Sequence, residues 1–476
     1  MSQVRTIFKN FSWLMLSQII TTICALVWTI LIPRYLGVNN YGIMNFAISL
    51  TGIAAITMDL GISTHIVRHI ATDFDSSKKY LGNAIPLKSV FSIFTFILIL
   101  ITLILMKCDD ITIQITLLFA IEQIFKSITG LLNGSLQAVE EGKYQAIGNI
   151  LLNILLLIFI LISIIGDFGL YGITLSYVTA NFCVVISQYI AVKKRLSKPK
   201  FELDLEFCKN ITIASIPFAL TSLFSLIISS IDMVMITNMV GSYANGIYSA
   251  AYKLTSVFVT FYGVYSAVVF PVMSRFFKNE KNLLFVSFEK SVKYLMLIFI
   301  PLSFATMVYS QDIIILFFGK EYLASSNALS ILMWTVSITI LCGVCSNLLN
   351  AAHKEKYVTL ILMASAIFNA ITNLFIIPKY SYIGAAITTI TTDILGTILF
   401  LYSIYKLGGL RNKKLLFDLI KIFAGSIILY ISLTILNLNM WVALPVGIII
   451  YFIIIILIRT FDEDDKYIIK EILGKN

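Results

Sequence analysis

The sequence has little charge, and no polar segment in it is long enough to form a soluble domain. Charged residues make up 13% of its 476 residues, against about 25% in an ordinary soluble domain. The longest charge-rich stretches, 193–209, 275–293 and 462–476, are too short to fold alone. These absences exclude a separate soluble catalytic domain, so any function must lie among apolar helices.

Residues and motifs that carry enzymatic chemistry are also scarce. Cys342 and Cys345 form a C-x-x-C, but it lies in an apolar run without polar flanks, which does not favour a redox or metal site. His65 and His69 have the spacing of two zinc ligands, yet no third ligand with suitable context follows. The sequence lacks a P-loop, a dinucleotide-binding glycine pattern and a nucleophile elbow. We therefore expect no catalytic residue, no metal, no cofactor and no ATP hydrolysis.

Apolar residues are abundant, at 59% of the chain, and they occur in long runs. A membrane-spanning helix needs about 20 mostly apolar residues. A window of about 19 residues predicts fourteen spans, at 11–32, 42–62, 84–106, 112–133, 146–165, 169–191, 211–236, 245–270, 291–309, 325–350, 357–377, 382–403, 417–436 and 441–458. The sequence therefore predicts an all-α polytopic membrane protein.

The distribution of lysine and arginine predicts the orientation of these spans. With the N-terminus in the cytoplasm, 29 of the 35 basic residues fall on the cytoplasmic side, four fall outside and two lie within spans. Cytoplasmic loops carry the excess of basic residues in membrane proteins. We expect both termini in the cytoplasm of a cell whose cytoplasmic (inner) membrane holds the chain. The net charge of +10 then reflects topology rather than nucleic-acid binding.

The sequence contains an internal repeat, in which three blocks recur in the same order. The segment 32–43 matches 236–247 at an offset of 204, and residues 131–144 match 348–357 at offsets of 213 to 217. Residues 172–181 match 384–393 at an offset of 212. Each half holds six helices, so the halves share one orientation and an axis along the membrane normal should relate them. A doubled bundle of this kind is typical of alternating-access transporters.

The repeat predicts the domain organisation. We expect an N-terminal six-helix bundle at 1–192, a basic cytoplasmic linker at 193–210, and a C-terminal six-helix bundle at 211–405. Residues 406–476 hold two additional transmembrane helices and a cytoplasmic tail.

Charged side chains inside the predicted spans are the candidate functional residues. A charge at the bilayer centre costs roughly 2.5–3.5 kcal/mol even on a lenient scale, so it usually faces a wet cavity or a partner. Glu122 and Asp393 fall near the midplane, whereas Asp59 and Asp232 approach helix ends. The six candidates are Asp59, Glu122, Lys126, Asp232, Lys253 and Asp393.

The sequence leaves two interpretations open for most of these residues. Glu122 and Lys126 are four residues apart on one helix face, so they can form a structural ion pair or line a cavity. Lys253 has no acid three or four residues away, which favours a cavity. Asp393 occupies the repeat position of Asn181 and is a candidate proton or cation site.

Two arginines lie at opposite membrane faces in this topology. Arg34 follows Pro33, and Arg68 lies between His65 and His69. Arginine binds phosphate bidentately, so each is a candidate for holding an anionic head group. Interfacial anchoring is an equally common use of such residues.

Several motifs occur in a characteristic order along the chain. They are 33–37 (PRYLG) with Tyr41-Gly42, 59–61 (DLG), Asp232 late in the seventh span, 319–323 (GKEYL), and Asn369 and Asn373 before 377–378 (IP) and 384–386 (GAA). In this order they resemble the polysaccharide or oligosaccharide flippases of the multidrug/oligosaccharidyl-lipid/polysaccharide (MOP) exporter superfamily. The resemblance covers almost the whole chain, and one departure is Ser381, where the family often has glycine.

This resemblance implies a MATE-like fold and translocation of a polyprenyl-(pyro)phosphate-linked oligosaccharide from the cytoplasmic to the outer leaflet. The family's cavity is typically cationic, and Lys126 and Lys253 match that character. Coupling to an H⁺ or Na⁺ gradient is common in the superfamily, and Glu122 and Asp393 are the first candidates for it here, followed by Asp232 and Asp59. Glycan polymerase or assembly proteins are expected partners beside the lipid bilayer.

Two related functions and two unrelated ones remain as alternatives. A MATE-type multidrug/cation antiporter typically has twelve spans and an acid in its first helix, and a peptidoglycan lipid-precursor flippase typically has charges there. The first span here, 11–32, has none. A membrane glycosyltransferase or polymerase would need a larger outer loop, and a scaffolding protein would not explain charges near the midplane.

Overall fold

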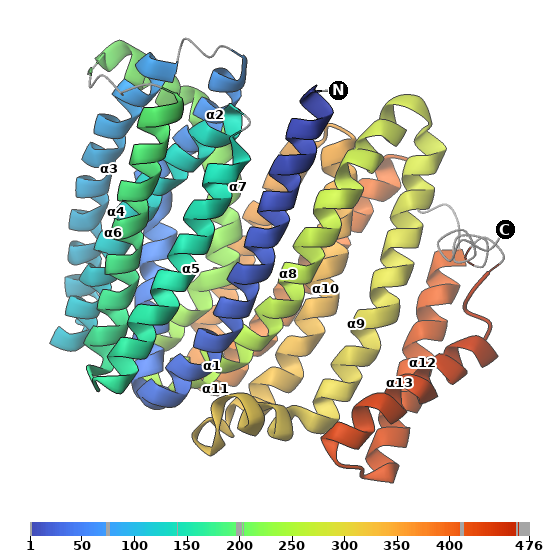
Figure 1. Cartoon of the computed structure of the whole chain (residues 1–476). Helices are drawn as coiled ribbons and strands as arrows, with labels where there is room; N and C mark the ends of the chain where they lie inside the picture. Colours follow the sequence, from blue (N-terminus) through green and yellow to red (C-terminus); the bar gives the residue numbers. More distant parts are fainter. Residues whose placement is uncertain are drawn as a thin grey trace. The chain divides into compact units, whose positions relative to one another are not determined.

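The computed structural model describes residues 2–72, 77–139, 141–196, 202, 204–409, 414–462 and 465. Within these ranges the chain is helical, with no strand. The helices are α1 (Ser2–Asp59), α2 (Ile62–Thr72), α3 (Ser77–Leu105), α4 (Asp110–Ala138), α5 (Gly142–Ile165), α6 (Gly169–Arg195), α7 (Leu205–Met239), α8 (Ser242–Asn279), α9 (Lys281–Phe318), α10 (Ser325–Ala351), α11 (Glu355–Lys406), α12 (Lys414–Leu436) and α13 (Met440–Leu457), with a 3₁₀ turn, η1, at Lys320–Tyr322 (Figure 1).

Twelve helices among the described residues are long and apolar enough to cross a membrane. Two of them, α1 and α11, each contain two of the predicted spans. Their backbones break at Gly37 (φ 69°) in α1 and at Ser381 (φ 54°) in α11. Counting each half separately gives the fourteen spans that the sequence predicts, in an all-helical polytopic membrane protein.

The break at Ser381 puts a side chain at a backbone conformation that favours glycine. A positive φ is accessible to glycine at no steric cost, whereas a side chain makes it unfavourable. Ser381 therefore holds a strained conformation at the corner between the two halves of α11.

Helix α2 was not predicted, because it is too short for a hydropathy window of membrane-spanning length. Its Ile62, Ile66 and Ile70 recur at intervals of four and are at most 1% exposed. They pack in one core with Leu131 and Leu132 of α4. Helix α2 is thus an amphipathic segment that lies against the bundle.

The two histidines of α2 are part of an aromatic stack. The ring centroids of His65 and His69 lie 4.4 Å apart, and His69 stacks on Tyr80 of α3 at 5.4 Å. Within the part of the chain described here, no group of three or more His, Cys, Asp or Glu side chains is arranged to hold a metal ion. The spacing of these histidines serves packing.

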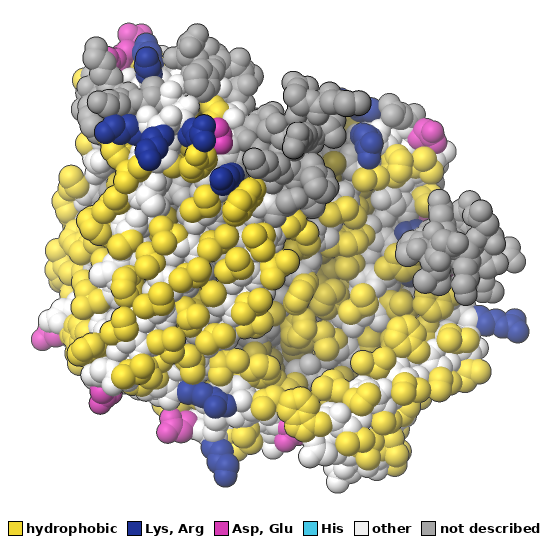
Figure 2. All heavy atoms as spheres, in the orientation of Figure 1, with side chains coloured by type: hydrophobic (Ala, Val, Ile, Leu, Met, Phe, Trp, Pro, Cys, Tyr) yellow, Lys and Arg dark blue, Asp and Glu magenta, His cyan; other side chains and the backbone are white. Residues whose placement is uncertain are grey.

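The chain divides into two compact units, Met1–Ser249 and Ala250–Asn476. This division reflects packing, whereas the predicted boundary at 193–210 reflects the sequence repeat. Helix α7 packs against α1 in the first unit, and in the second unit α12 packs against α9. In Figure 2 hydrophobic side chains cover the middle of the helices, and charged side chains gather toward the helix ends.

Within the first unit, α1 and the start of α8 approach each other at backbone distance. A Cβ atom on Gly42 would lie 1.8 Å from the carbonyl oxygen of Ser242, and one on Gly246 would lie 2.0 Å from that of Val38. At the repeat offset of 204, Gly42 is equivalent to Gly246 and Val38 to Ser242. The contact is therefore reciprocal between repeat-equivalent residues. The amide of Asn245 adds a hydrogen bond to the carbonyl oxygen of Gly42 at 2.8 Å.

An ion-pair cluster joins α9, α12 and the segment after α13 in the second unit. We call Lys290, Lys293, Asp418, Asp462 and Asp465 the C-terminal clasp. Lys293 Nζ lies 2.8 Å from Asp418 Oδ2 and 2.5 Å from Asp465 Oδ2, and Lys290 Nζ lies 2.5 Å from Asp465 Oδ1. The side chain of Asp465 is fully buried and that of Lys293 is 3% exposed. The clasp fixes the chain after the two additional helices onto α9.

Hydrogen bonds keep the clasp charged. Burial raises the pKa of Asp462 and Asp465, but hydrogen bonds from Lys414 to Asp462, and from Lys290 and Lys293 to Asp465, outweigh that effect. The pKa of each carboxyl is thereby lowered from its usual value of 3.8. A lowered pKa contributes stability that is fully present above pH 3.8 and is lost as the pH falls through the folded-state value.

The first prediction concerns the glycine contact. Gly246→Ala should lower the free energy of unfolding by about 1–3 kcal/mol, because its methyl group meets backbone that only a helix shift can move. Thermal unfolding of the detergent-solubilised protein measures this effect. Gly130→Ala is the matched control, since nothing lies within 4 Å of a Cβ at that helical glycine. Equal melting temperatures for the two variants would contradict the contact.

The second prediction concerns the clasp. Asp465→Asn should destabilise the protein by about 3–5 kcal/mol near neutral pH, because it leaves buried lysines with too few carboxylates. The difference in melting temperature from the unmodified protein should stay constant between pH 5 and 8 and shrink below about pH 4. Glu355→Gln, at a side chain that is 65% exposed, should change little. A difference that grew on acidification would refute the clasp.

Candidate functional site

The central pair of charges in the first unit is formed by Glu122 and Lys126 of α4. Glu122 Oε1 lies 2.7 Å from Lys126 Nζ. The side chain of Glu122 is 1% exposed, whereas that of Lys126 is 46% exposed. The Asn181 amide of α6 donates a hydrogen bond of 3.0 Å to the same Glu122 oxygen. The carboxylate is therefore enclosed between two helices and the ammonium remains accessible.

This geometry brings together the two interpretations that the sequence left open. The i, i+4 ion pair exists, as a structural role requires. The exposed part of the pair is the cation, as a ligand-binding role requires. Because hydrocarbon cannot solvate an ammonium group, the accessible side of Lys126 needs water or an anion. Substrate binding by Lys126 stays a prediction.

The second unit contains a related arrangement at the repeat-equivalent positions. Thr339 of α10 donates a hydrogen bond of 2.8 Å to Asp393 Oδ2 of α11. At the offset of 217 that applies to this helix, Thr339 is equivalent to Glu122, and Asp393 is equivalent to Asn181 at the offset of 212. In each half, one carboxylate accepts a hydrogen bond from the neighbouring helix of an equivalent helix pair. The acid lies on α4 in the first half, but on α11, the equivalent of α6, in the second.

The two arrangements differ in the cation. The position equivalent to Lys126 is Gly343, so α10 has no lysine four residues after Thr339. Around Asp393 lie other polar groups: the Cys342 thiol donates to its backbone oxygen at 3.6 Å, and the Thr397 hydroxyl donates to the same oxygen at 2.8 Å. The roles of Asp393 and Glu122 in ion coupling remain predictions.

A second buried ion pair joins Asp59, at the end of α1, to Lys88 of α3. Lys88 Nζ lies 2.5 Å from Asp59 Oδ1, 2.9 Å from Ser63 Oγ and 2.7 Å from the carbonyl oxygen of Ser127. The Lys88 side chain is 1% exposed. Lys88 is one of the 29 basic residues that the charge distribution assigns to the cytoplasmic side, but it lies among four helices. Its three acceptors use all three ammonium hydrogens, so the pair stabilises the packing of these helices. A role of Asp59 in ion coupling stays a prediction.

The other sequence-predicted residues lie in separate places. Asp232 of α7 is 3% exposed and accepts a hydrogen bond of 2.7 Å from the Tyr248 hydroxyl. Lys253 of α8 is half-buried and belongs to the second unit, whereas Lys126 belongs to the first. Arg34 of α1 is exposed. The side chain of Arg68 lies outside the described residues.

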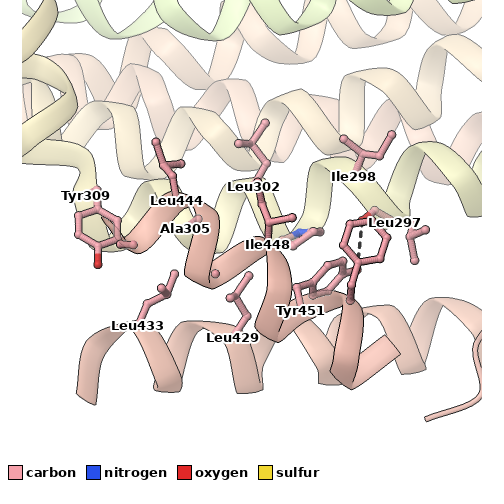
Figure 3. A pocket seen from close by; sticks show the side chains of 14 residues that line it. Leu297, Ile298, Leu302, Ala305, Tyr309, Leu429, Leu433, Leu444, Ile448 and Tyr451 are labelled. Carbon is pink, nitrogen blue, oxygen red and sulfur yellow. Dashed lines mark hydrogen bonds between the residues drawn. The ribbon is translucent and has the colours of Figure 1, made fainter. Parts of the chain in front are cut away.

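An apolar groove runs between α9, α12 and α13 in the second unit (Figure 3). Its volume is about 350 Å³. Leu302, Leu429 and Leu444 point into it, and Tyr451 turns its hydroxyl away to the carbonyl oxygen of Leu297 at 3.1 Å. Such a lining suits hydrocarbon and offers nothing to a charged or hydroxylated head group.

The third prediction separates the two lysines of the first unit. Lys88→Ala should destabilise the fold by about 3–5 kcal/mol, because it leaves Asp59 without its buried cation. Lys88→Met combined with Asp59→Asn should recover much of that loss. Lys126→Gln combined with Glu122→Gln should keep the fold, because the exposed lysine is replaced without leaving a buried charge. Melting temperature and the yield of monodisperse protein measure these effects, and equal behaviour of Lys88→Ala and the Glu122/Lys126 double variant would be inconsistent with the assignment.

Comparisons with known proteins agree with this architecture. The chain is 25% identical to the capsular polysaccharide biosynthesis protein CapF of Staphylococcus aureus over 408 residues, covering 83% of this chain and 98% of CapF. It is 23% identical over 382 residues to the "Probable low-salt glycan biosynthesis flippase Agl15" of Haloferax volcanii, covering 77% of this chain and 76% of that protein.

A solved structure of the lipid II flippase MurJ in an inward closed conformation superimposes with a TM-score of 0.75 at 18% identity, covering 94% of this chain and 98% of MurJ. This likeness shows that the chain shares the fold of MurJ.

Two family profiles match the sequence. The MatE profile matches residues 217–375. The profile described as polysaccharide biosynthesis protein matches residues 7–277, which is more than half of the chain. The chain belongs to the polysaccharide biosynthesis protein family.

Proposed function

We propose that this protein moves a polyprenyl-(pyro)phosphate-linked oligosaccharide from the cytoplasmic to the outer leaflet of the cell membrane by alternating access. Relatives named as capsular polysaccharide biosynthesis protein and glycan biosynthesis flippase support this proposal, as does the fold shared with a lipid II flippase. The protein is accordingly a membrane transporter and not an enzyme.

One observation carries the proposal: a half-exposed lysine stands on a buried carboxylate inside a membrane-spanning helix. Lys126 reaches out from α4 while Glu122 behind it is enclosed by α6. A pyrophosphate attracts such an ammonium strongly, because the effective dielectric constant in a narrow membrane site is far below that of water. The second predicted cavity lysine, Lys253, is also partly accessible.

The pairing suggests how ion binding and substrate binding are coupled. While Glu122 is ionised, it holds Lys126 at 2.7 Å and competes with the phosphate for it. A proton on Glu122 removes this competition and releases the lysine for the head group. Proton and substrate then favour each other's binding, as linkage requires. Asp393, Asp232 and Asp59 are the further candidates for coupling to an H⁺ or Na⁺ gradient.

The membrane and its orientation follow from the charge distribution. Without Lys88, 28 basic residues on one side against four on the other favour cytoplasmic termini in a cytoplasmic (inner) membrane protein. A substrate made in the cytoplasm then meets the basic face first. Glycan polymerases or assembly proteins would receive the substrate on the other side.

Two other cargoes are the competing functions. A MATE-type exporter would carry cationic drugs, and a peptidoglycan-precursor flippase would carry lipid II. The MatE profile match and the MurJ fold keep both in view. An exposed cation at the proposed site disfavours the cationic cargo, because like charges repel in a low-dielectric site.

The fourth prediction tests cargo and lysine together. In proteoliposomes, the protein should translocate a fluorescent polyprenyl pyrophosphate that carries a disaccharide, as measured by access of a membrane-impermeant quencher. Glu122→Gln should retain substrate binding, and adding Lys126→Gln to it should weaken the apparent affinity about ten-fold or more, because a charge-assisted contact is lost. The glutamine at 122 ensures that no unpaired carboxylate confounds the comparison.

Controls and contrary outcomes are defined by the same assay. Lys320→Gln, at an exposed lysine of η1, should behave like the unmodified protein. Equal affinity of Glu122→Gln with and without Lys126 would eliminate the lysine mechanism. Uptake of a cationic dye without movement of the glycolipid would make the protein a drug exporter.

A further inference from the structure

A cluster of polar and aromatic side chains in the second unit lies outside the charged site. The Asn347 amide of α10 donates hydrogen bonds to the Tyr262 hydroxyl at 3.0 Å and to Ser266 Oγ at 2.6 Å, both on α8. The hydroxyl of Tyr265, the residue next to Ser266, donates to Ser291 Oγ of α9 at 2.7 Å. These two groups of hydrogen bonds come from three helices and meet at the rings of Tyr262 and Tyr265; together we call them the tyrosine cluster.

The tyrosine cluster is neither buried nor fully exposed. Tyr262, Tyr265, Ser266 and Asn347 are all partly accessible, although they lie on helices that are apolar enough to span a membrane. Hydroxyl and amide groups that face hydrocarbon cost several kcal/mol each in lost hydrogen bonding. The accessible side of the cluster therefore faces water or a polar ligand.

The hydrogen-bonding capacity that remains matches a sugar. Asn347 donates both amide hydrogens within the cluster, so its carbonyl oxygen is left as an acceptor. The hydroxyls of Tyr262 and Ser266 accept these hydrogens and are hydrogen-bonded to each other, so one hydroxyl hydrogen of the two remains as a donor. The carbonyl acceptor of Asn347 and a hydroxyl donor beside it complement two neighbouring hydroxyl groups of a sugar. The rings of Tyr262 and Tyr265, 6.3 Å apart, add faces whose negative charge attracts sugar C–H groups.

The backbone of α10 holds the Tyr262 ring in place. A Cβ atom on Gly343 would lie 2.3 Å from Tyr262 Cε1 and 2.7 Å from its hydroxyl oxygen. Only glycine at 343 lets the ring rest against the helix. A methyl group there would push Tyr262 away from Asn347, one helical turn further along.

The internal repeat allows the residues of this cluster to be compared with the equivalent residues of the first half, which include Lys126. At the offset of 217, Gly343 is equivalent to Lys126 and Asn347 to Gly130. Where the first half presents an ammonium group, the second half presents a tyrosine ring and an amide. The equivalent positions thus carry a side chain suited to a phosphate in the first half and side chains suited to neutral hydroxyl groups in the second.

We propose that the tyrosine cluster is a saccharide subsite that binds hydroxyl groups of the glycan during transport. Tyr262, Ser266 and Asn347 supply the hydrogen bonds, and Gly343 and Tyr265 set the position of the rings. This assignment rests on the proposed function and assigns the neutral part of the substrate to residues other than Lys126.

The test compares two lipids that differ only in the sugar. One is a fluorescent polyprenyl pyrophosphate carrying a disaccharide of N-acetylhexosamines, and the other is the same lipid without sugar. Tyr262→Phe, Asn347→Leu and Gly343→Ala should each raise the apparent KM for the glycosylated lipid about 3- to 10-fold, the effect of losing one or two neutral hydrogen bonds. Their KM for the sugar-free lipid should stay unchanged.

Matched variants keep the result interpretable. Gly263→Ala adds the same methyl group next to Tyr262 in open space and should alter neither KM. Tyr262→Phe keeps the ring and removes only a hydroxyl, so its melting temperature should match that of the unmodified protein and exclude misfolding. Gly343→Ala combined with Tyr262→Ala should behave as Tyr262→Ala alone, because the clash is gone.

Each outcome decides between the proposals. An unmodified protein that moves neither lipid removes the proposed function itself. Transport of the glycosylated lipid with unchanged KM in all three variants overturns only the saccharide subsite. Equal loss for both lipids overturns it too, because it shows a general effect on the transport cycle.

Discussion

The close contact between α1 and α8 is the constraint on which the architecture depends. Gly42 and Gly246 each face the backbone of the other helix at a distance that admits no Cβ. Without a hydrophobic driving force between helices in lipid, association relies on such close packing of small residues. The same short glycine motif occurs once in each repeat. Its two copies contact each other, so each glycine packs against the backbone of the other copy. The side chains elsewhere on these helices are then free to differ.

The two halves differ in which polar side chains occupy their equivalent positions. One carboxylate lies on α4 and is bound by an asparagine of α6, and the other lies on α11 and is bound by a threonine of α10. The hydrogen bond between the two equivalent helices is present in both halves, but the carboxylate is on the first helix of the pair in one half and on the second in the other. A lysine accompanies the acid only in the first half, so the cation belongs to one half of the transporter rather than to the fold.

The sequence predicted the features that depend on local pattern. Fourteen spans followed from the lengths of apolar runs, and the glycine motifs revealed the repeat before any contact was known. The Glu122–Lys126 pair was predictable because its members are four residues apart. The Asp59–Lys88 pair and the clasp of Lys293 with Asp418 and Asp465 were not, because hydropathy does not reveal which distant helices bring a charge its partner. Helix α2 was missed because its apolar face is only three residues long.

The arrangement of Lys126 resolves a conflict between holding and releasing an anion. A lysine in a membrane site attracts a phosphate strongly, because the effective dielectric constant there is low. The carboxylate 2.7 Å from Lys126 weakens that attraction by competing for the same hydrogens. In the proposed mechanism that competition is useful, since a carrier that bound pyrophosphate with an unopposed lysine would release it slowly. The buried Glu122 and the exposed Lys126 therefore act together: the lysine binds the anion, and the glutamate limits how tightly it is held. The tyrosine cluster complements it, because neutral hydrogen bonds select the glycan without adding to the charge that must be released.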